Sequence, residues 1–321
     1  MKKLRVGVLG LGSIFHRVMT GFNRAENCEL YAVAARDCER ARAEEEKYGA
    51  SVWFGSYEEL IACPDVDLIY VATPHGLHHE HVIKCLEAGK NVLCEKAFAL
   101  NGAQARDMVE CARMNNVFLM EAMWTRFLPA MRALADILKE EKYGKLRHLF
   151  ADFSFPAPFN PEGRMFNPAL GGGALLDVGI YPLSVFNMLM GSDPVKVEAT
   201  CKKAETGVDA RTVAQLTYEG DRTAQFMCGI DTVGTSDMLV YTDKCVIKVP
   251  GFWHATRLEL PDGVMEFPPE NEGHHHQFVH VADMLAQGRK ESPIMPLDET
   301  VRLMDIMTDI RISNGVKYPC D

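Results

Sequence analysis

A glycine pair near the start of the chain, Gly10-Leu11-Gly12, is the first feature whose residue types and spacing point to chemistry. It follows the apolar run 4–9 and precedes a stretch of helical period, a setting in which glycines let the backbone approach a pyrophosphate. The free N–H groups at the start of such a helix donate to phosphate oxygens. The pattern predicts that a dinucleotide binds at Gly10, Leu11, Gly12, Ser13 and Ile14.

Phe15 departs from the usual form of this fingerprint. The third position of G-x-G-x-x-G/A falls on Phe15, whose ring is too large for the close helix–strand packing that glycine allows. An ordinary glycine turn between strand and helix is therefore the alternative to a phosphate site. The alternation of strands and helices around the turn favours the phosphate site.

The end of the second expected strand bears on the choice of cofactor. It reads Ala34-Ala35-Arg36-Asp37, and Arg40 follows one helical turn later. The Arg36 guanidinium can pair with a 2′-phosphate through two hydrogen bonds, and Arg40 adds positive charge. The sequence therefore favours NADP over NAD, with Ala35 and Arg36 as cofactor contacts. The alternative is a solvated Arg36, with Asp37 accepting hydrogen bonds from the ribose of NAD.

Two polar segments leave the carboxyl ends of neighbouring expected strands, where open parallel sheets bind their ligands. They are Thr73-Pro74-His75-Gly76-Leu77-His78 and Cys94-Glu95-Lys96-Ala97. Three more stretches combine glycine, aromatic and charged residues: 121–127, 171–181 and 291–294. These segments add the following predicted cofactor contacts: Thr73, Pro74, His75, His78, Glu95, Lys96 and Arg126.

Taken together, the segments resemble the Gfo/Idh/MocA oxidoreductases over essentially the whole chain. In that family an E-K-P motif supplies a reactive lysine, which the resemblance assigns to Lys96, and an L-D-x-G-x-Y motif supplies an acid/base tyrosine, assigned to Tyr181. Ala97 stands where the family usually has proline. The resemblance implies an NADP-dependent oxidoreductase that acts on a secondary or anomeric alcohol of a sugar or cyclic trans-diol.

General chemistry agrees with these two assignments. Hydride leaves an alcohol carbon only as the hydroxyl proton is removed, so the site needs a base and a positive charge for the developing alkoxide. A lysine ammonium within about 4–6 Å favours the phenolate form of a tyrosine. Lys96 and Tyr181 are the predicted catalytic pair. Asp177, four residues before Tyr181 on a helix expected over 175–190, is predicted to orient one of them or the substrate.

Aromatic residues near the motifs are candidates for a substrate wall. Sugar and cyclic diol rings present C–H faces that pack on aromatic rings. The candidates for such a wall are Trp124, Phe153, Phe155 and Phe159, and packing in the core is the alternative for these rings. Trp124 and Phe155 join Asp177 and Tyr181 as predicted substrate contacts. The run His274-His275-His276 lacks carboxylate or cysteine partners at metal-binding spacing. We expect no metal there, and the role of the run stays open.

The order of the expected elements predicts two domains. Short β-branched runs alternate with helical stretches up to residue 124, which is typical of βαβ units. Beyond it, short alternating segments from 195 to 267 indicate a mostly antiparallel, open sheet. We expect an α/β Rossmann domain with a parallel sheet over 1–124. An α+β domain over 125–321 would serve substrate binding and dimerisation.

Composition limits the remaining function classes. The 321 residues carry a net charge of −10, which disfavours nucleic acid as a partner. No apolar run approaches the roughly eighteen residues of a membrane span, so we expect no membrane partner. The ten cysteines are scattered without metal-type spacing, which predicts reduced thiols and a cytoplasmic protein.

Two other functions stay open beside the dehydrogenase. The same acid/base pair would serve a reductase of a keto or aldehydo sugar, because the sequence does not fix the direction of the reaction. A non-catalytic NADP-binding sensor would keep the fold but lose the reactive pair, and Lys96 and Tyr181 are both present. We also expect a homodimer, since an open antiparallel sheet exposes a face that needs cover.

Overall fold

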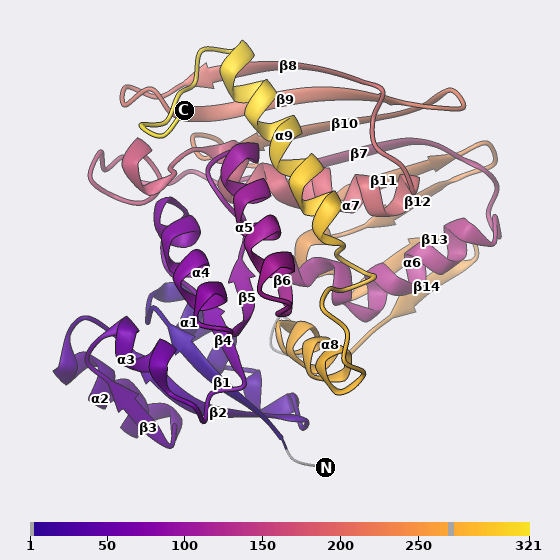
Figure 1. Cartoon of the computed structure of the whole chain (residues 1–321). Helices are drawn as coiled ribbons and strands as arrows, with labels where there is room; N and C mark the ends of the chain where they lie inside the picture. The colour runs from indigo at the N-terminus through magenta and orange to yellow at the C-terminus, as the bar shows by residue number, and fades with distance from the viewer. Residues whose placement is uncertain (1–2, 269–272) are drawn as a thin grey trace. The chain divides into compact units, whose positions relative to one another are not determined.

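The computed structural model describes residues 3–268 and 273–321, and the chain divides into two compact units (Figure 1). The first unit comprises Met1–Ala99, Ala103–Trp124 and Glu270–Val301. The second comprises Leu100–Gly102, Thr125–Pro269 and Arg302–Asp321. The units therefore differ from the two continuous segments, 1–124 and 125–321, that the sequence predicted, because the chain returns to the first unit near its end.

A six-stranded parallel sheet forms the centre of the first unit. Its strands lie in the order β3-β2-β1-β4-β5-β6. The direction of this order reverses beside β1, which is the point at which open sheets of this kind bind dinucleotides. The strands are β1 (Leu4–Leu9), β2 (Cys28–Ala34), β3 (Val52–Phe54), β4 (Leu68–Val71), β5 (Asn91–Glu95) and β6 (Leu119–Ala122).

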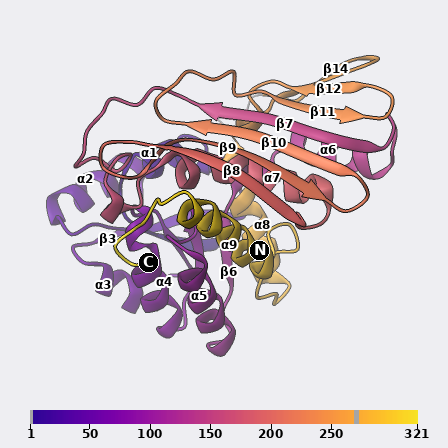
Figure 2. The same cartoon turned by 90° about the horizontal axis from the view of Figure 1, so that it is seen from above.

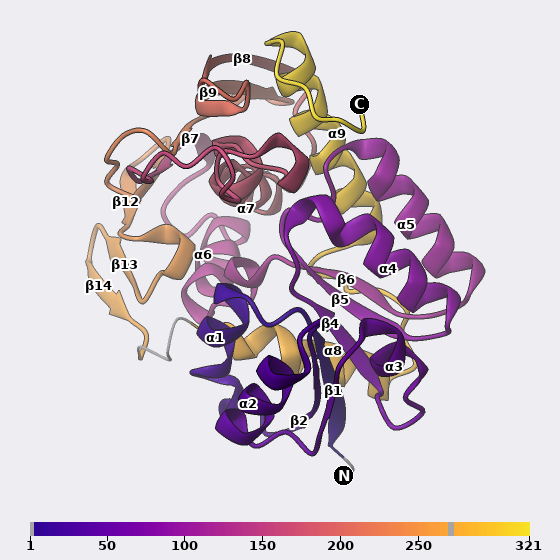
Figure 3. The same cartoon turned by 90° about the vertical axis from the view of Figure 1, so that its left-hand side faces the viewer.

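Helices cover both faces of the parallel sheet. In Figure 3, α4 and α5 lie on one side of the strands, and α2 and α8 lie on the other. All four residues of β4 are buried, as expected for a strand covered on both faces. The helices of this part are α1 (Ser13–Met19), α2 (Cys38–Tyr48), α3 (Tyr57–Ala62), α4 (His78–Glu87), α5 (Gly102–Met114) and α8 (His275–Ala286). The predicted Rossmann fold is thus confirmed.

An eight-stranded sheet forms the centre of the second unit. Its order is β14-β13-β12-β11-β7-β10-β9-β8, and its pairs are antiparallel except β7 with β10. The predicted mostly antiparallel sheet is confirmed. The strands are β7 (Leu146–Ser154), β8 (Lys196–Lys203), β9 (Asp209–Tyr218), β10 (Arg222–Gly229), β11 (Met238–Thr242), β12 (Val246–Val249), β13 (Arg257–Leu260) and β14 (Gly263–Glu266).

Helices α6 (Pro129–Lys139) and α7 (Ile180–Met190) lie on one face of this sheet, as Figures 1 and 2 show. Side chains of β10 that alternate toward this face, such as Phe226, are fully buried. The last helix, α9 (Leu297–Ser313), ends in this unit. A π-helical turn, Leu175–Gly179, precedes α7, so the single α-helix expected over 175–190 is a π turn followed by an α-helix.

One stretch of the second unit, Pro168–Met190, is long and apolar enough to cross a membrane, and its most apolar 18-residue window has a mean hydropathy of 1.4. This differs from the sequence expectation that no apolar run approaches such a length. In the structure 89% of its most apolar window is buried. Burial within the fold accounts for its apolar character, because core helices that are hydrophobic all round have the same composition.

Candidate active site

The turn between β1 and α1 has the conformation that its glycines predict. Gly10 has a φ of +100°, and a Cβ atom there would lie 2.8 Å from Thr73 Cγ2 and 3.0 Å from the Ala72 carbonyl oxygen. Any other residue would require a shift of the backbone. A Cβ atom at Gly12 would meet nothing within 4 Å, so the space beside the turn is open. The turn therefore leaves room for a phosphate group, and the dinucleotide contact at residues 10–14 stays a prediction.

Phe15 has a packing role that differs from that of the glycine usually found at this position of the fingerprint. Its ring is fully buried and packs edge-on against Tyr48 of α2, with 5.1 Å between the ring centroids. The neighbouring His16 Nδ1 lies 2.9 Å from the Tyr48 hydroxyl oxygen. The large side chain thus packs α1 against α2 and leaves the turn at Gly10 intact.

At the end of β2, the Asp37 carboxylate serves as the N-cap of α2. Its Oδ1 accepts hydrogen bonds from the backbone N–H groups of Glu39 and Arg40, at 3.0 and 3.2 Å. The Arg40 side chain donates to the carbonyl oxygen of Leu11, in the glycine turn. One carboxylate oxygen of Asp37 is thus engaged at the start of α2, and the Arg36 side chain is exposed beside it.

His78 joins the two loops that leave β4 and β5. It is fully buried, with Nε2 2.7 Å from the carbonyl oxygen of Thr73 and Nδ1 2.9 Å from that of Ala97. Burial lowers the pKa of His78 to about 4. The side chain has no exposed surface, so the direct cofactor contact predicted for His78 is replaced by a contact that fixes both loops. Of the same segment, Pro74 is exposed and His75 is half-buried.

The side chain of Glu95 is also buried, and it forms hydrogen bonds within the protein. Its buried carboxylate accepts hydrogen bonds from the Tyr70 hydroxyl at 2.5 Å and from the Lys96 backbone N–H at 3.3 Å. This differs from the cofactor contact predicted for Glu95. The contacts hold the end of β5, from which the half-buried Lys96 follows at the carboxyl edge of the sheet.

Trp124 and His274 form a stacked pair in the first unit. Their ring centroids are 4.0 Å apart and their planes make an angle of 23°. Trp124 is 1% exposed, so core packing, the alternative left open by the sequence, describes it better than the predicted substrate contact. Burial and the positive charges of Arg17 and Lys96 lower the pKa of His274 to about 3. The histidine run thus contributes a neutral, buried ring near Lys96, a role that no spacing in the sequence indicated.

Tyr181 lies in an aromatic cluster of the second unit. Its ring packs edge-on against Phe153 and Trp253, with centroid distances of 5.2 and 6.5 Å. Phe153 and Trp253 are stacked on each other at 5.0 Å. Phe153 is one of the aromatic residues that the sequence named for a substrate wall, and it is the one whose ring contacts Tyr181. The substrate contact predicted for Phe155 stays a prediction. Trp253 lies on a 3₁₀ turn (Phe252–His254) without a recognisable motif, so sequence reasoning did not place it.

Asp177 lies in the π-helical turn just before Tyr181. Its carboxylate is nearly buried, and its Oδ1 forms an ion pair with Arg164 Nη1 at 3.0 Å. Asp177 lies in the π turn Leu175–Gly179, whereas Tyr181 lies in the α-helix that follows it. The two residues therefore do not share the one regular α-helix that the sequence predicted. Arg164 is a partner that the sequence did not indicate. The orienting role of Asp177 stays a prediction.

Arg126 contacts a helix of its own unit. It is 1% exposed, its Nε donates to the Ser184 hydroxyl at 2.8 Å, and its Nη2 donates to the Ser184 carbonyl oxygen at 2.5 Å. The cofactor contact predicted for Arg126 is thus replaced by a contact that fixes α7. Within residues 3–268 and 273–321, no three His, Cys, Asp or Glu side chains are grouped so as to hold a metal ion.

The parallel sheet, its strand order and the glycine turn define a Rossmann fold of the class that binds dinucleotides. Residues 4–123 match the oxidoreductase family with an NAD-binding Rossmann fold, and residues 131–248 match the GFO/IDH/MocA C-terminal domain. The chain belongs to the Gfo/Idh/MocA family, as the sequence predicted. It is an NAD(P)-dependent oxidoreductase that acts on CH–OH groups.

Several dehydrogenases and reductases resemble the chain over nearly its whole length. The trans-1,2-dihydrobenzene-1,2-diol dehydrogenases of Mus musculus and Homo sapiens are 38% and 36% identical, over 99% of this chain and 99% of theirs. Among solved structures, the aldose-aldose oxidoreductase from Caulobacter crescentus has a TM-score of 0.87 and 25% identity over 98% of each chain. The 3-ketoreductase KijD10 from Actinomadura kijaniata, in complex with NADP, has a TM-score of 0.85 and 26% identity over 97% of this chain and 98% of its own.

Proposed function

We propose that the protein is an NADP-dependent dehydrogenase of a secondary or anomeric alcohol in a sugar or cyclic trans-diol. The observation that carries the proposal is the setting of Tyr181, whose ring lies against Phe153 and Trp253. Aromatic faces of this kind suit the C–H face of a sugar or cyclic diol. The names of the relatives that cover 99% of the chain support the same substrate class.

The residues at the end of β2 support NADP in preference to NAD. Asp37 is engaged as a helix cap, and Arg36 is exposed beside it. A guanidinium pairs with a 2′-phosphate more strongly than with a neutral 2′-hydroxyl. When bound, NADP supplies a nicotinamide ring that exchanges a hydride with the substrate carbon.

Two side chains of this protein carry the proton transfer in the proposal. Tyr181 takes the hydroxyl proton of the substrate as general base, and Lys96 supplies positive charge to the developing alkoxide. Asp177 orients the substrate hydroxyl or one of these two groups. Phe153 and Trp253 hold the substrate ring and keep water away from Tyr181.

The test of this assignment replaces the two groups separately. Tyr181→Phe keeps the ring in its cluster and removes the hydroxyl, and Lys96→Met keeps the stem and removes the charge. General acid–base catalysis contributes about 10²- to 10⁴-fold, so we expect losses of that order in kcat with each variant. Steady-state rates of NADP reduction with aldoses, polyols and cyclic diols measure the loss. Retention of wild-type kcat/KM by both variants would eliminate the assignment.

The cofactor proposal has its own test at Arg36. Hydrogen bonds to charged groups contribute about 1.5–3 kcal/mol, so Arg36→Ala should weaken NADPH binding roughly 10- to 100-fold and leave NADH binding unchanged. Fluorescence titration of both cofactors measures this. Arg42→Ala is the matched control, because Arg42 is an exposed arginine of α2 that pairs with Glu46. An unchanged NADPH affinity in Arg36→Ala would disprove the role of Arg36.

Catalysis mainly in the direction of reduction is the second candidate. It is favoured by the likeness to KijD10, a 3-ketoreductase. We also propose that the protein forms a homodimer and that it is located in the cytoplasm. All ten cysteines are free thiols, which suits a reducing compartment.

A further inference from the structure

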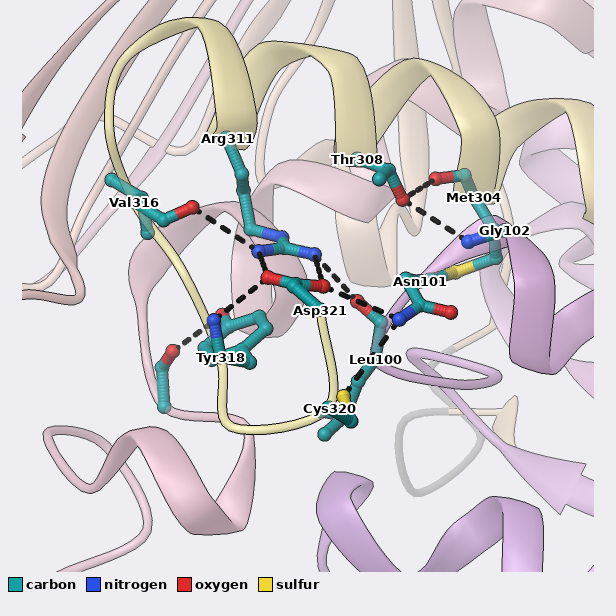
Figure 4. A network of polar contacts seen from close by, with 11 residues as sticks. Leu100, Asn101, Gly102, Met304, Thr308, Arg311, Val316, Tyr318, Cys320 and Asp321 are labelled. Atoms are coloured by element: carbon teal, nitrogen blue, oxygen red, sulfur yellow. Dashed lines mark hydrogen bonds and ion pairs between the residues drawn. The ribbon is translucent and has the colours of Figure 1, made fainter.

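Residues 314–321 follow α9, and a buried ion pair holds this segment against that helix (Figure 4). The Arg311 side chain is fully buried. Its Nη1 and Nη2 donate to the two carboxylate oxygens of Asp321, at 2.8 and 3.1 Å. The planar guanidinium thereby fixes the direction of the carboxylate as well as its distance. Segment 314–321 is thus held in one conformation beside α9.

The same ion pair reaches residues 100–102, the short part of the second unit that follows Lys96 in the chain. Arg311 Nη2 donates to the Leu100 carbonyl oxygen at 3.0 Å, and Asn101 Nδ2 donates to Asp321 Oδ1 at 3.2 Å. The Gly102 N–H donates to the Thr308 hydroxyl at 3.1 Å. Figure 4 shows these groups converging on Asp321 and α9. Residues 100–102, which follow the loop that holds Lys96, are therefore fixed within the second unit.

Tyr318, in segment 314–321, links this ion pair to the glycine run 171–173, which precedes Tyr181. Its hydroxyl donates to the Gly172 carbonyl oxygen at 2.6 Å, and the residue is 4% exposed. Its ring lies under the Arg311 guanidinium at 4.1 Å, and its N–H donates to Asp321 Oδ2 at 2.7 Å. Burial raises the pKa of the Tyr318 hydroxyl well above its usual value, so it stays a donor.

The glycine run is held from its other side by β9. A Cβ atom at Gly173 would lie 2.3 Å from Asp209 Oδ1, so the run passes too close to β9 for any other residue. Asp209 Oδ2 accepts a hydrogen bond from the Leu175 N–H at 2.7 Å. The π turn that holds Asp177 begins at Leu175, and Tyr181 follows it. Tyr318 and Asp209 together therefore determine where this turn begins.

We propose that Tyr318 is a positioning residue for the catalytic tyrosine: through the Gly172 carbonyl it fixes the start of the turn that carries Asp177 and Tyr181. This inference rests on the proposed function of Tyr181. Because Arg311 and Asp321 hold Tyr318 and residues 100–102 at once, segment 314–321 braces the backbone that precedes Tyr181 within the second unit. Catalytic groups misplaced by about 1 Å lose on the order of 100-fold in rate, so a brace at this point acts on kcat.

Tyr318→Phe is the sharpest test, because it keeps the ring on Arg311 and removes only the bond to Gly172. We expect kcat and kcat/KM to fall together by about 10- to 100-fold, with NADPH affinity unchanged, since the interaction acts on the transition state and not on binding. Tyr218→Phe is the matched control. Tyr218 is 2% exposed and donates to Asn187 Oδ1 at 3.0 Å, at the far end of α7.

Thermal unfolding separates positioning from plain stability. Both phenylalanine variants should lower Tm by a similar amount, and only Tyr318→Phe should lower kcat. Asp321→Asn provides a second test, because it weakens the hold on Tyr318 without touching Gly172, and it should give a smaller loss of kcat. Equal kcat in Tyr318→Phe, Tyr218→Phe and the wild type would overturn the inference. If Tyr181→Phe is also fully active, the proposed function fails; if Tyr181→Phe is inactive, only the role of Tyr318 fails.

Discussion

Asp209 shows how strongly burial changes a single residue of this protein. Its side chain is fully buried, and its Oδ2 accepts hydrogen bonds from the Leu175 N–H at 2.7 Å and the Thr212 hydroxyl at 3.0 Å. Burial raises the pKa of Asp209 from 3.8 to about 6, against the lowering effect of these hydrogen bonds. The folded protein therefore binds a proton at Asp209 more tightly than the unfolded chain does.

This difference predicts a specific dependence of stability on pH. Between about pH 4 and pH 6 the native state holds the proton and the unfolded state does not, so the contribution of Asp209 to stability falls as pH rises and is constant above that window. Asp209→Asn removes the titration. The free energy of unfolding of the wild type minus that of the variant should fall by up to about 3 kcal/mol from pH 4 to pH 7. Urea unfolding of both proteins measures it, and a difference that is independent of pH would refute the role of Asp209.

At the residue scale, the sequence predicted the local backbone better than what the side chains touch. Gly10 has the backbone conformation that its place in the turn predicts, and the cofactor contact of Arg36 stays a prediction. His78, Glu95 and Arg126 were predicted to face the cofactor, yet each is buried and bonded to the chain itself. A motif places a residue at the end of a strand, but the direction of its side chain depends on partners that are remote in sequence.

At the scale of elements, those with strong local signals were predictable. The start of α2 is marked by Asp37, whose side chain accepts two backbone hydrogen bonds, and its end by Gly49, which adopts a φ of +71°. Capping residues and left-handed glycines act over three or four residues, so they are visible in the sequence. The same holds for β1 and the glycine turn that follows it.

Elements whose shape depends on packing were not predictable in the same way. The π turn Leu175–Gly179 has the same apolar composition as an α-helix, and its wider turn lies against β10, where a Cβ atom at Gly179 would come 2.8 Å from Cys228 Sγ. Strand β3, with three residues, is too short to show alternation. In both cases the contacts across the sheet, and not local preference, decide the conformation.

At the scale of the whole molecule, the sequence gives no sign of the return of the chain to the first unit. Helix α8 has the apolar period of any core helix, and period alone does not tell which sheet a helix covers. In the structure its Phe278 ring packs edge-on against Tyr70 of β4 at 5.2 Å. The stacked pair of Trp124 and His274 depends on this return, which is why the histidine run could not be interpreted from the sequence.

The outer face of the eight-stranded sheet is the feature that bears on assembly. Inward residues of β10 face η5 (Leu175–Gly179) and α7, whereas the alternate residues point away from these helices. Register places Leu239, Phe150 and Gln225 in one row on that outer face, with Met227 and Val213 in the next. All five are at least partly exposed, and Val213 is 40% exposed. Four of the five, Leu239, Phe150, Met227 and Val213, are apolar, and exposed apolar side chains gathered across several strands are typical of an interaction surface.

The homodimer that we propose would bury this stripe of apolar side chains. The stripe of one subunit would pack against the same stripe of the other, as a two-fold axis requires. Light scattering should then give about 72 kDa, twice the 35.8 kDa of one chain. Val213→Glu places a charge at the β9 end of the stripe, where its desolvation in the dimer is costly, and should shift the protein toward the monomer. Met114→Glu is the matched control, since Met114 is 79% exposed at the end of α5 and lies off the sheet. A monomeric wild type, or dissociation by Met114→Glu to the same extent as by Val213→Glu, would exclude this face as the dimer interface.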